Sequence, residues 1–354
     1  MASPVIKQNV GNDLSKDDFS VCFYQKREDQ STRIKATRKF KNTLSGFKAF
    51  DKWVAKHQCD ELPVYITIEA TGVYHEQLVH FLHDQKRYRI SVVLPNKSKA
   101  FAKSLNVKTK TDEVDAKILG QMGLERELEQ WQPISQSLRQ IKQLTRERIN
   151  LLDEKVALSN KIHAQNHAYA PSREVIKRLK QRLKLIEQQI KQVEKQLNQC
   201  IDKDPMLKER IDKIWLVKGL GIITVVSVIA ETAGFDLFTS QSQVASYAGY
   251  DIVQRESGSS IKGKTRISKK GNRFIRRALY FPAISVVKYE PQFKQLYERI
   301  TERTSIKMKG LVAVQRKLLM LSYTLFKKNE AYDPQFAQKQ QKISRQDTSP
   351  AYTG

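Results

Sequence analysis

One stretch near the middle of the chain restricts the fold more than any other. From Ile176 onward, apolar residues recur in alternating steps of three and four, which is the spacing of a coiled-coil seam. Pro171 and Ser172 mark the start of this helix, and Ser172 is a suitable N-cap residue. The seam consists of Ile176, Leu179, Leu183, Ile186, Ile190, Val193 and Leu197. The stretch therefore predicts a long helix that packs along one stripe.

The segment 138–162 supplies a second helix for this packing. It has almost no Gly or Pro and is highly charged, although its apolar spacing is less regular. Two antiparallel helices that turn near the sequence NHAYAPS explain both segments. The resulting hairpin could close on itself or contact a partner chain, and the residues are compatible with both.

The first 125 residues alternate between strand and helix patterns. Five strands are expected at NVGNDLS, FSVCFYQ, TRIKATRKF, PVYITIEA and RISVVLP. Helices are expected at SGFKAFDKWVAKH, with Ser45 as its N-cap, and at YHEQLVHFLHDQK. This order predicts a mixed α/β sheet with helices on its faces.

Residues 206–330 predict a second, mainly helical globular unit. Gly219 and Gly221 lead into an apolar helix, and this turn is either a phosphate-binding hairpin turn or a plain helix entry. Two more helices are expected at IRRALYFPAISVV and GLVAVQRKLLMLSYTLFKK. We therefore divide the chain into an α/β domain at 1–125, a helical coiled-coil segment at 126–205, a helical domain at 206–330 and a disordered polar tail at 331–354.

The net charge restricts the class of partner. The chain carries 63 Lys and Arg against 37 Asp and Glu, for a net charge of +26. A charge of this size favours nucleic acid over an anionic membrane surface or a merely solubilising role. No apolar stretch reaches the roughly 18 residues that span a bilayer, and the N-terminus lacks the order of a signal peptide. Three cysteines without metal-ligand or disulfide spacing fit a reducing cytoplasm, so we expect a cytoplasmic protein without a membrane partner.

Much of the positive charge lies in one run, RESGSSIKGKTRISKKGNRFIRR, at 255–277. It holds nine Lys or Arg and one acid. Its expected contacts with phosphate are Lys262, Lys264, Arg266, Lys269, Lys270, Arg273, Arg276 and Arg277. A second basic series, which could also be a solvated face, consists of Lys97, Lys99, Lys103, Lys108 and Lys110.

Four acids suggest a metal site. Asp13 and Glu69 lie in or at the end of apolar strands, where carboxylates are costly unless they are paired or bound to metal. Asp112 and Asp115 are three residues apart, so a helix places both on one face. Taken singly, each acid could be a cap or a surface residue. Taken together in a basic protein, the four favour a site for Mg²⁺.

These segments resemble a known family. VGNDLSK, IEATGVYHEQLVHFL, VVLPNKSKAFAKSL and KTKTDEVDAKIL are similar to the RuvC-like, DEDD-type transposases of bacterial insertion sequences. GLGIITVVSVIAE, FTSQSQVASYAGY and ESGSSIKGKTRISKKGNRFIRRALY resemble the second domain of that family. The resemblance implies an RNase H-like fold, a coiled-coil insertion and a mainly helical transposase domain. It also implies similarity to recombinases that a bridge RNA guides.

The resemblance assigns roles to particular residues. It implies that Asp13, Glu69, Asp112 and Asp115 hold one or two Mg²⁺ ions and that Ser257 forms a covalent phosphoserine with DNA. Ser259 and Ser260 are the competing nucleophiles. The implied partners are donor and target double-stranded DNA, a structured non-coding guide RNA, and copies of this chain, as a dimer that assembles into a tetrameric synapse. The alternatives are a metal-dependent nuclease or Holliday-junction resolvase with a structural serine, and a non-catalytic nucleic-acid-binding protein.

Overall fold

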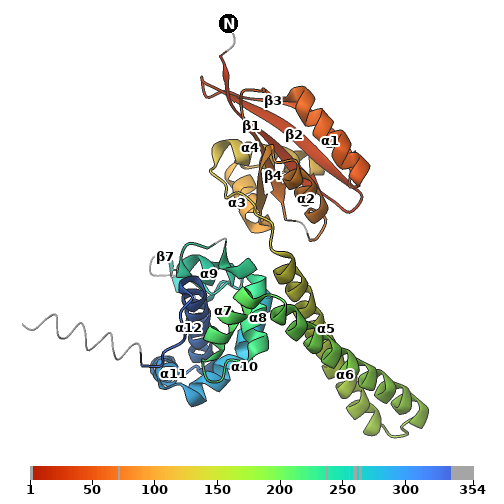
Figure 1. Ribbon diagram of the computed structural model, residues 1–354, viewed down its shortest axis with the longest axis vertical. Coiled ribbons are helices and arrows are strands. Elements are labelled where there is room, and N and C mark those ends of the chain that lie inside the picture. The colour runs from red at the N-terminus through yellow and green to blue at the C-terminus, as the bar shows by residue number, and fades with distance from the viewer. Residues whose placement is uncertain are drawn as a thin grey trace, which may run out of the picture. The chain divides into compact units, whose positions relative to one another are not determined.

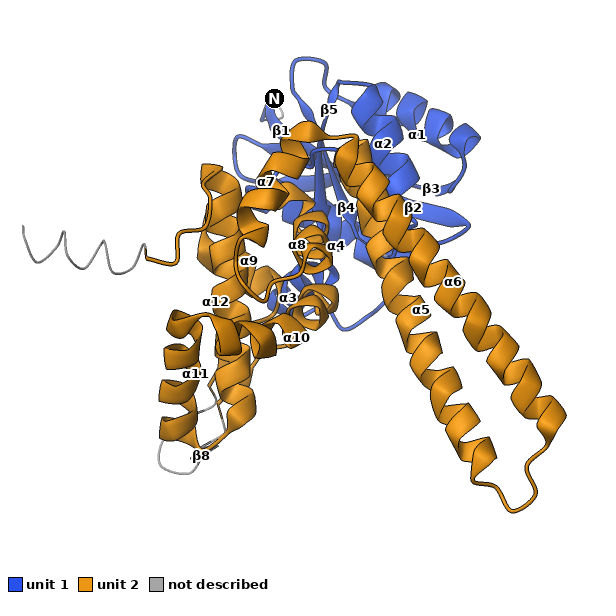
Figure 2. Cartoon of the chain, turned by 60° about the horizontal axis from the view of Figure 1, so that its bottom comes forward, with its two compact units in different colours: residues 1–133 blue, residues 134–354 orange. Residues whose placement is uncertain are grey.

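The computed structural model describes residues 3–335, except 71, 237, 255, 258–260 and 263–264. For 256–257 and 261–262 it describes the backbone only. The chain forms two compact units, Met1–Pro133 and Ile134–Gly354, which Figure 2 colours separately. Within the described residues, no helix is both long enough and apolar enough to cross a membrane.

The first unit is built on a mixed five-stranded sheet, as expected (Figure 1). Its strands are β1 Val5–Leu14, β2 Asp18–Arg27, β3 Thr32–Lys41, β4 Val64–Glu69 and β5 Tyr88–Val93. They lie in the order β3-β2-β1-β4-β5. The first three strands pair antiparallel, whereas β1, β4 and β5 pair parallel. The central strand β1 is therefore flanked by one neighbour of each kind.

Helices cover both faces of this sheet. They are α1 Leu44–His57, α2 Glu76–Asp84, α3 Pro95–Ser104 and α4 Asp112–Glu125. Phe50 of α1 and Leu78 of α2 pack with Val10 and Leu14 of β1 in one hydrophobic core. Because side chains alternate along a strand, Gly11 points to the opposite face, where α4 lies against it.

Two features of the first unit differ from the sequence analysis. The N-cap of α1 is Thr43, whose side chain accepts a hydrogen bond from the Gly46 N–H, so the assignment of Ser45 was wrong. A further helix, α3, begins with Pro95 at a position where proline costs no hydrogen bond. The sequence analysis had ended a strand at that proline.

The second unit contains the long helical hairpin and a helical body. The hairpin is α5 Gln136–Asn166 and α6 Arg173–Asp202, which lie side by side in Figures 1 and 2. Ser172 caps α6 by accepting from the Val175 N–H, as expected. The body comprises α7 Pro205–Trp215, α8 Ile222–Glu231, the short 3₁₀ helix Ala233–Phe235, α9 Gln241–Tyr247, α10 Arg273–Tyr289, α11 Pro291–Thr304 and α12 Lys307–Lys328.

One hydrophobic core runs through this unit. Leu144 of α5 and Ile201 of α6 belong to the same buried cluster as Val228 of α8 and Leu318 of α12. The division of this unit at 205 therefore stays a prediction. The expected tail starts later than residue 331, because the Tyr332 hydroxyl donates to the buried Glu290 carboxylate at 2.6 Å. Residues 336–354 lie outside the described residues.

Candidate functional site

The pairing of β1 with β4 places two of the four acids on one face of the sheet. Gly11 pairs with Thr67 and Asn12 pairs with Ile68 in the parallel register. Asp13 and Glu69 are the next residues on the two strands, and each lies two positions beyond the Gly11–Thr67 pair. Because side chains alternate, both carboxylates point to the face that α4 covers. The strand ends thus bring these two acids together as neighbours.

Helix α4 approaches this face closely because glycines form the contact. A Cβ atom added at Gly11 would lie 2.1 Å from the backbone nitrogen of Gly120. One added at Gly123 would lie 2.2 Å from the Thr67 Oγ1 atom. Gly11 therefore lies directly against the backbone of α4, and Gly123 leaves the space that the Thr67 and Asn9 side chains occupy. The close approach holds the first turn of α4 near the ends of β1 and β4.

That first turn carries the other two acids. Thr111 is the N-cap of α4, and its side chain accepts a hydrogen bond from the Val114 N–H. Asp112 is therefore the first residue of the helix, not its cap, and Asp115 follows on the same face one turn later. Asp112 is exposed and forms a 3.8 Å ion pair with Lys39 of β3, whereas Asp115 is half-buried.

The electrostatics couple all four acids. Burial raises the pKa of Asp13 to about 7, and it is the largest cause of the shift. The negative charges of Asp115, Glu69 and Asp112, in that order, add to the rise in the pKa of Asp13. Burial also raises the pKa of Asp115, and the charges of Glu69 and Asp112 contribute. Mutual repulsion of this kind makes the face favourable for a cation.

Three neighbours moderate this repulsion. Lys110 opposes the rise in the pKa of both Asp13 and Asp115, and Lys99 opposes that of Asp115. The Glu69 carboxylate accepts a hydrogen bond from the Ser98 hydroxyl of α3. Lys99 lies on α3 next to that serine, and Lys110 lies just before α4. Two of the five lysines of the second basic series therefore reach the acidic face.

The other three lysines of that series are exposed, without a described contact to the acids. Lys97 and Lys103 are exposed on α3, and Lys108 is exposed in the segment between α3 and α4.

The chemistry of the acidic face suits a hard divalent cation, because its donors are carboxylate oxygens. Within the described residues, no three His, Cys, Asp or Glu side chains already form a group that could hold a metal ion. Asp112 is exposed, and its only ion pair within the described residues is the 3.8 Å pair with Lys39. The face is thus a set of coupled donors and not a preformed cage.

The proposed nucleophile lies in the second unit, on a short β-ribbon. β7 Glu256–Ser257 pairs antiparallel with β8 Ile261–Lys262, and Ser257 faces Ile261 across the ladder. A second ladder, β6 Ile252–Val253 with β9 Arg266–Ile267, lies outside it in sequence. Ser259, Ser260 and Lys264 fall outside the described residues, and the Ser257 and Lys262 side chains are not described. The fold therefore holds the Ser257 backbone through antiparallel pairing with β8.

The far end of the basic run is clamped to the turn after α9. Lys269 N–H donates to the Gly249 carbonyl at 3.1 Å, and Asn272 N–H donates to the Tyr247 carbonyl at 2.7 Å. Gly249 adopts a φ of 75°, and a Cβ at Gly271 would lie 2.4 Å from the Tyr247 oxygen. Both glycines are required for this close approach. Arg266, Lys269, Lys270 and Arg273 are exposed along the clamped segment.

Two arginines of the run already bind protein oxygens. Arg276 Nη1 donates to the Ala248 carbonyl at 2.6 Å. The Arg277 guanidinium forms a two-pronged ion pair with the Asp153 carboxylate of α5. These contacts favour a structural role for both residues over the phosphate contact expected from the sequence.

The sequence analysis missed a buried acid that organises this region. Glu231, at the end of α8, is 2% exposed. Its carboxylate accepts from Arg146 Nε at 2.6 Å and Nη2 at 2.9 Å, and from Asn272 Nδ2 at 2.7 Å. Asn272 in turn caps α10 by accepting from the Phe274 and Ile275 N–H groups. An acid at the end of the apolar stretch VVSVIAE was the signal that could have identified it.

Comparison with known proteins defines the class. A family model of DEDD transposases of the IS110 type, described as transposase, matches residues 10–171. A second, described as the transposase IS116/IS110/IS902 family, matches residues 213–298. The two matches identify a DEDD-type transposase, an enzyme that acts on DNA, and they cover more than half of the chain. The chain therefore belongs to the IS110-type transposases, in agreement with the resemblance seen in its motifs.

Two relatives are similar over nearly the whole chain. They are the pilin gene-inverting proteins of Moraxella bovis and Moraxella lacunata. Each is 29% identical over 336 residues, which is 92% of this chain and 98% of the relative. Among solved structures, an Aquifex aeolicus PPX-GPPA enzyme aligns with a TM-score of 0.22 and 15% identity over 30% of this chain and 43% of that chain. A likeness of that size carries no argument.

Proposed function

We propose that this chain is an RNA-guided DNA recombinase that exchanges strands between insertion-sequence donor DNA and target DNA. The observation that carries the proposal is the convergence of Asp13, Glu69, Asp112 and Asp115 on one face of the first unit. The strand order β3-β2-β1-β4-β5, with two antiparallel and two parallel pairings, supports an RNase H-like fold for that unit. The similarity to gene-inverting proteins supports site-specific exchange of DNA strands.

The four acids would hold Mg²⁺, as one or two ions. Bound there, Mg²⁺ would lower the cost of negative charge on a phosphodiester and on the oxygens that attack or leave it. Asp13 must give up its proton to act as a ligand, and its raised pKa indicates that the face resists a fourth negative charge without a cation. Lys99 and Lys110 would contact phosphate oxygens at the same face.

Ser257 would supply the nucleophile. Its Oγ attacks a DNA phosphorus atom, a phosphoserine bond forms, and the bond to one deoxyribose oxygen breaks. The serine proton ends on that leaving oxygen. Attack by the hydroxyl of an exchanged strand then restores the phosphodiester and returns the proton to Ser257. Each step replaces one phosphoester bond with another, so the exchange needs no nucleotide hydrolysis.

The basic run would position the substrate. Lys262, Lys264, Arg266, Lys269, Lys270 and Arg273 are the proposed contacts to phosphate, because they precede or begin α10 and the described ones are exposed. A structured guide RNA would select the DNA, in keeping with contacts to the backbone and not to bases. A dimer that assembles into a tetrameric synapse would let the acids and the serine of different copies act on one junction.

The serine is tested with purified protein, guide RNA and both DNA duplexes. Ser257→Ala should abolish strand exchange and the covalent protein–DNA adduct, whereas Ser259→Ala and Ser260→Ala, the matched controls, should retain both. Full strand exchange by Ser257→Ala would exclude a phosphoserine intermediate at this residue. If the wild type cleaved DNA without strand exchange and without a covalent adduct, the alternative of a junction resolvase with a structural serine would be favoured.

The metal site is tested without reference to turnover. Mg²⁺ should raise the midpoint of thermal unfolding of the wild type, because an ion that binds only the folded chain stabilises it. This rise in the unfolding midpoint should be lost in Asp13→Asn and in Glu69→Gln. It should be retained in Glu113→Gln, because Glu113 is an exposed acid of the first turn of α4 outside the proposed set of four. An equal rise of the unfolding midpoint with Mg²⁺ in all of these variants would contradict a metal site at the four acids.

A further inference from the structure

We infer that the first half of α6 carries a row of cations that binds the phosphate backbone of nucleic acid. The inference adds a contact surface to the proposed function, on a segment for which sequence patterning predicts only helix packing. The row consists of Arg173, Lys177, Lys180 and Lys184.

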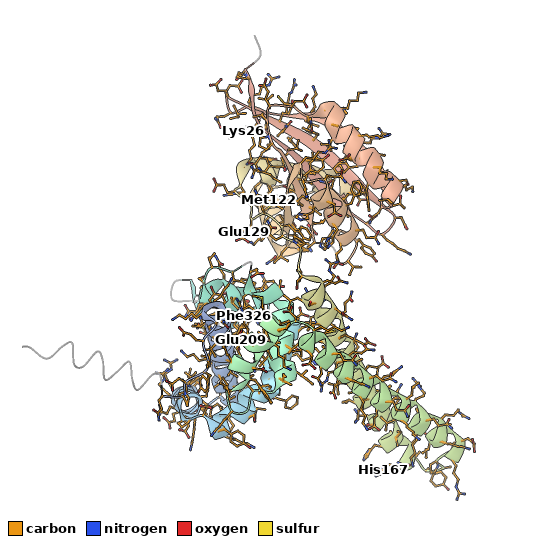
Figure 3. The ribbon with its side chains drawn as sticks, in the orientation of Figure 1. Lys26, Met122, Glu129, His167, Glu209 and Phe326 are labelled. Carbon is orange, nitrogen blue, oxygen red and sulfur yellow. The ribbon has the colours of Figure 1, made fainter. Side chains whose placement is uncertain are left out.

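The row follows from the geometry of the helix. Its members are separated by steps of four, three and four, so they project from one side of α6 and span about 16 Å. Neighbours in such a row lie about 5–6 Å apart at their Cβ atoms. With Ile176 and Gln181 they line a shallow groove along the helix. The turn at His167, labelled in Figure 3, marks the end of the hairpin near which the row begins.

The charge of α6 changes sharply along its length. Residues 173–184 contain six Lys or Arg and one acid, Glu174. Residues 185–202 contain two Lys and three acids. Self-repulsion of six cations within about three turns is unfavourable for an isolated helix. The first half therefore gains from a polyanion, whereas the second half is nearly balanced.

The intramolecular partners show the same division. All three acids of the second half form ion pairs: Glu187 with Lys155, Glu194 with Arg148, and Asp202 with Lys208. In the described residues, none of the six cations of 173–184 forms an ion pair within 4.0 Å, and all six are exposed. The row is thus available to an external anion without loss of an internal contact.

Nucleic acid fits this surface better than a second copy of the chain. The seam residues Ile186, Ile190 and Val193 are already buried within the hairpin. A second copy laid along the first half of α6 would bring six more cations against these six. A phosphate backbone presents a regular series of negative charges and releases condensed counterions when cations neutralise it. Charge complementarity therefore selects the polyanion.

The test removes two charges from the row in the full chain. Lys180→Gln with Lys184→Gln keeps side-chain length and helix propensity. Arg178→Gln with Arg182→Gln is the matched control, because it removes two charges from the opposite side of the same half of α6. The probes are a 30-base-pair DNA duplex and an RNA duplex of the same length. Affinity is measured for both against salt concentration.

The row predicts a specific result. The slope of log affinity against log salt should fall by about two for the row variant on at least one duplex, and stay within error for the control. Loss on RNA alone assigns the row to the guide, and loss on DNA alone assigns it to the substrate. An unchanged slope on both duplexes, or an equal fall in slope for both variants, would contradict nucleic-acid binding by the row. A change in oligomeric mass without a change in slope would contradict it as well.

A second measurement separates this inference from the proposed chemistry. A photoreactive side chain at position 181, within the groove, should cross-link to the duplex, whereas one at position 188, on the same side two turns further, should not. Both are made in the Ser257→Ala background. Cross-linking at 181 together with failed strand exchange by the wild type would contradict the proposed function and support nucleic-acid binding by the row. Strand exchange by the wild type without cross-linking at 181 would support the proposed function and contradict binding by the row.

Discussion

The acidic face of the first unit and the basic run of the second are held in opposite ways. The acids lie at the ends of long paired strands, and a glycine contact without side chains presses α4 against them. Ser257 lies in a ladder of two residues per strand, and the run is anchored at its far end by charge, through Glu231, Arg146 and Asn272. A larger side chain at the glycine contact should therefore destabilise the first unit, whereas removal of a buried charge should destabilise the region that anchors the basic run.

Glu231→Gln should have the largest effect on stability. The substitution leaves the Arg146 guanidinium without its carboxylate and weakens the bond to Asn272. Breaking a buried pair costs about 3–5 kcal/mol, and the lower end applies because the Arg146 side chain is 40% exposed. The measurement is chemical denaturation of the full chain. A loss below about 1 kcal/mol would show that charge does not hold the run.

Gly11→Ala should be next, at about 1–3 kcal/mol from overpacking. The new methyl group would meet the backbone of Gly120 and Ala116, which cannot move without displacing α4. Gly221→Ala is the control, because a Cβ at that position meets nothing within 4 Å. Thermal unfolding distinguishes the two. If Gly11→Ala were as stable as the wild type, the close contact between helix and sheet would be refuted.

Asp13→Asn sharpens the comparison through pH. The folded-state pKa of Asp13, about 7, exceeds its ordinary value of 3.8, so the ionised carboxylate destabilises the fold increasingly as pH rises between these values. Without divalent cations, the variant should gain stability over the wild type, and the gain should be larger at pH 8 than at pH 5.5. Unfolding midpoints in a chelator at both pH values provide the measurement. A gain that is independent of pH would contradict the coupling of the acids.

Asp153→Asn should have the smallest effect. Its ion pair with Arg277 is exposed, with the two side chains 57% and 45% accessible. Pairs of this kind contribute about 0.2–1 kcal/mol. The same denaturation assay applies, ideally at low and high salt, since screening should erase the difference. A loss comparable to that of Glu231→Gln would mean that exposed and buried charges contribute equally here.

Much of the fold was predictable from periodicity. The five strands of the sheet, the two helices of the hairpin and its Ser172 cap follow from alternation, the heptad seam and capping chemistry. Helices α3, α7, α9 and α11 were missed. Three of them, α3, α7 and α9, are short. Helices α3, α7 and α11 begin at a proline, which suggests the end of a helix in sequence although proline suits the first helical turn.

The candidate site was predictable only as a set of residue types. Residue spacing placed Asp112 and Asp115 on one helix face, but the register that makes Asp13 and Glu69 neighbours depends on strand pairing across 56 residues of sequence. The structural use of Arg276 and Arg277 depends on partners on other elements, which a count of basic residues does not reveal. Whether Ser257 reacts stays a prediction.

The two contacts that α5 makes through charge have a mechanical consequence. Arg146 and Asp153 are seven residues apart, so they lie on the same side of α5 about two turns from each other. One is fixed to Glu231 and the other to Arg277 of α10. Two contacts about two turns apart favour one direction of α5 relative to α8 and α10, and they restrict rotation about the line that joins them far less. A force on the tip of the hairpin would therefore reach the basic run as torsion more than as tilt.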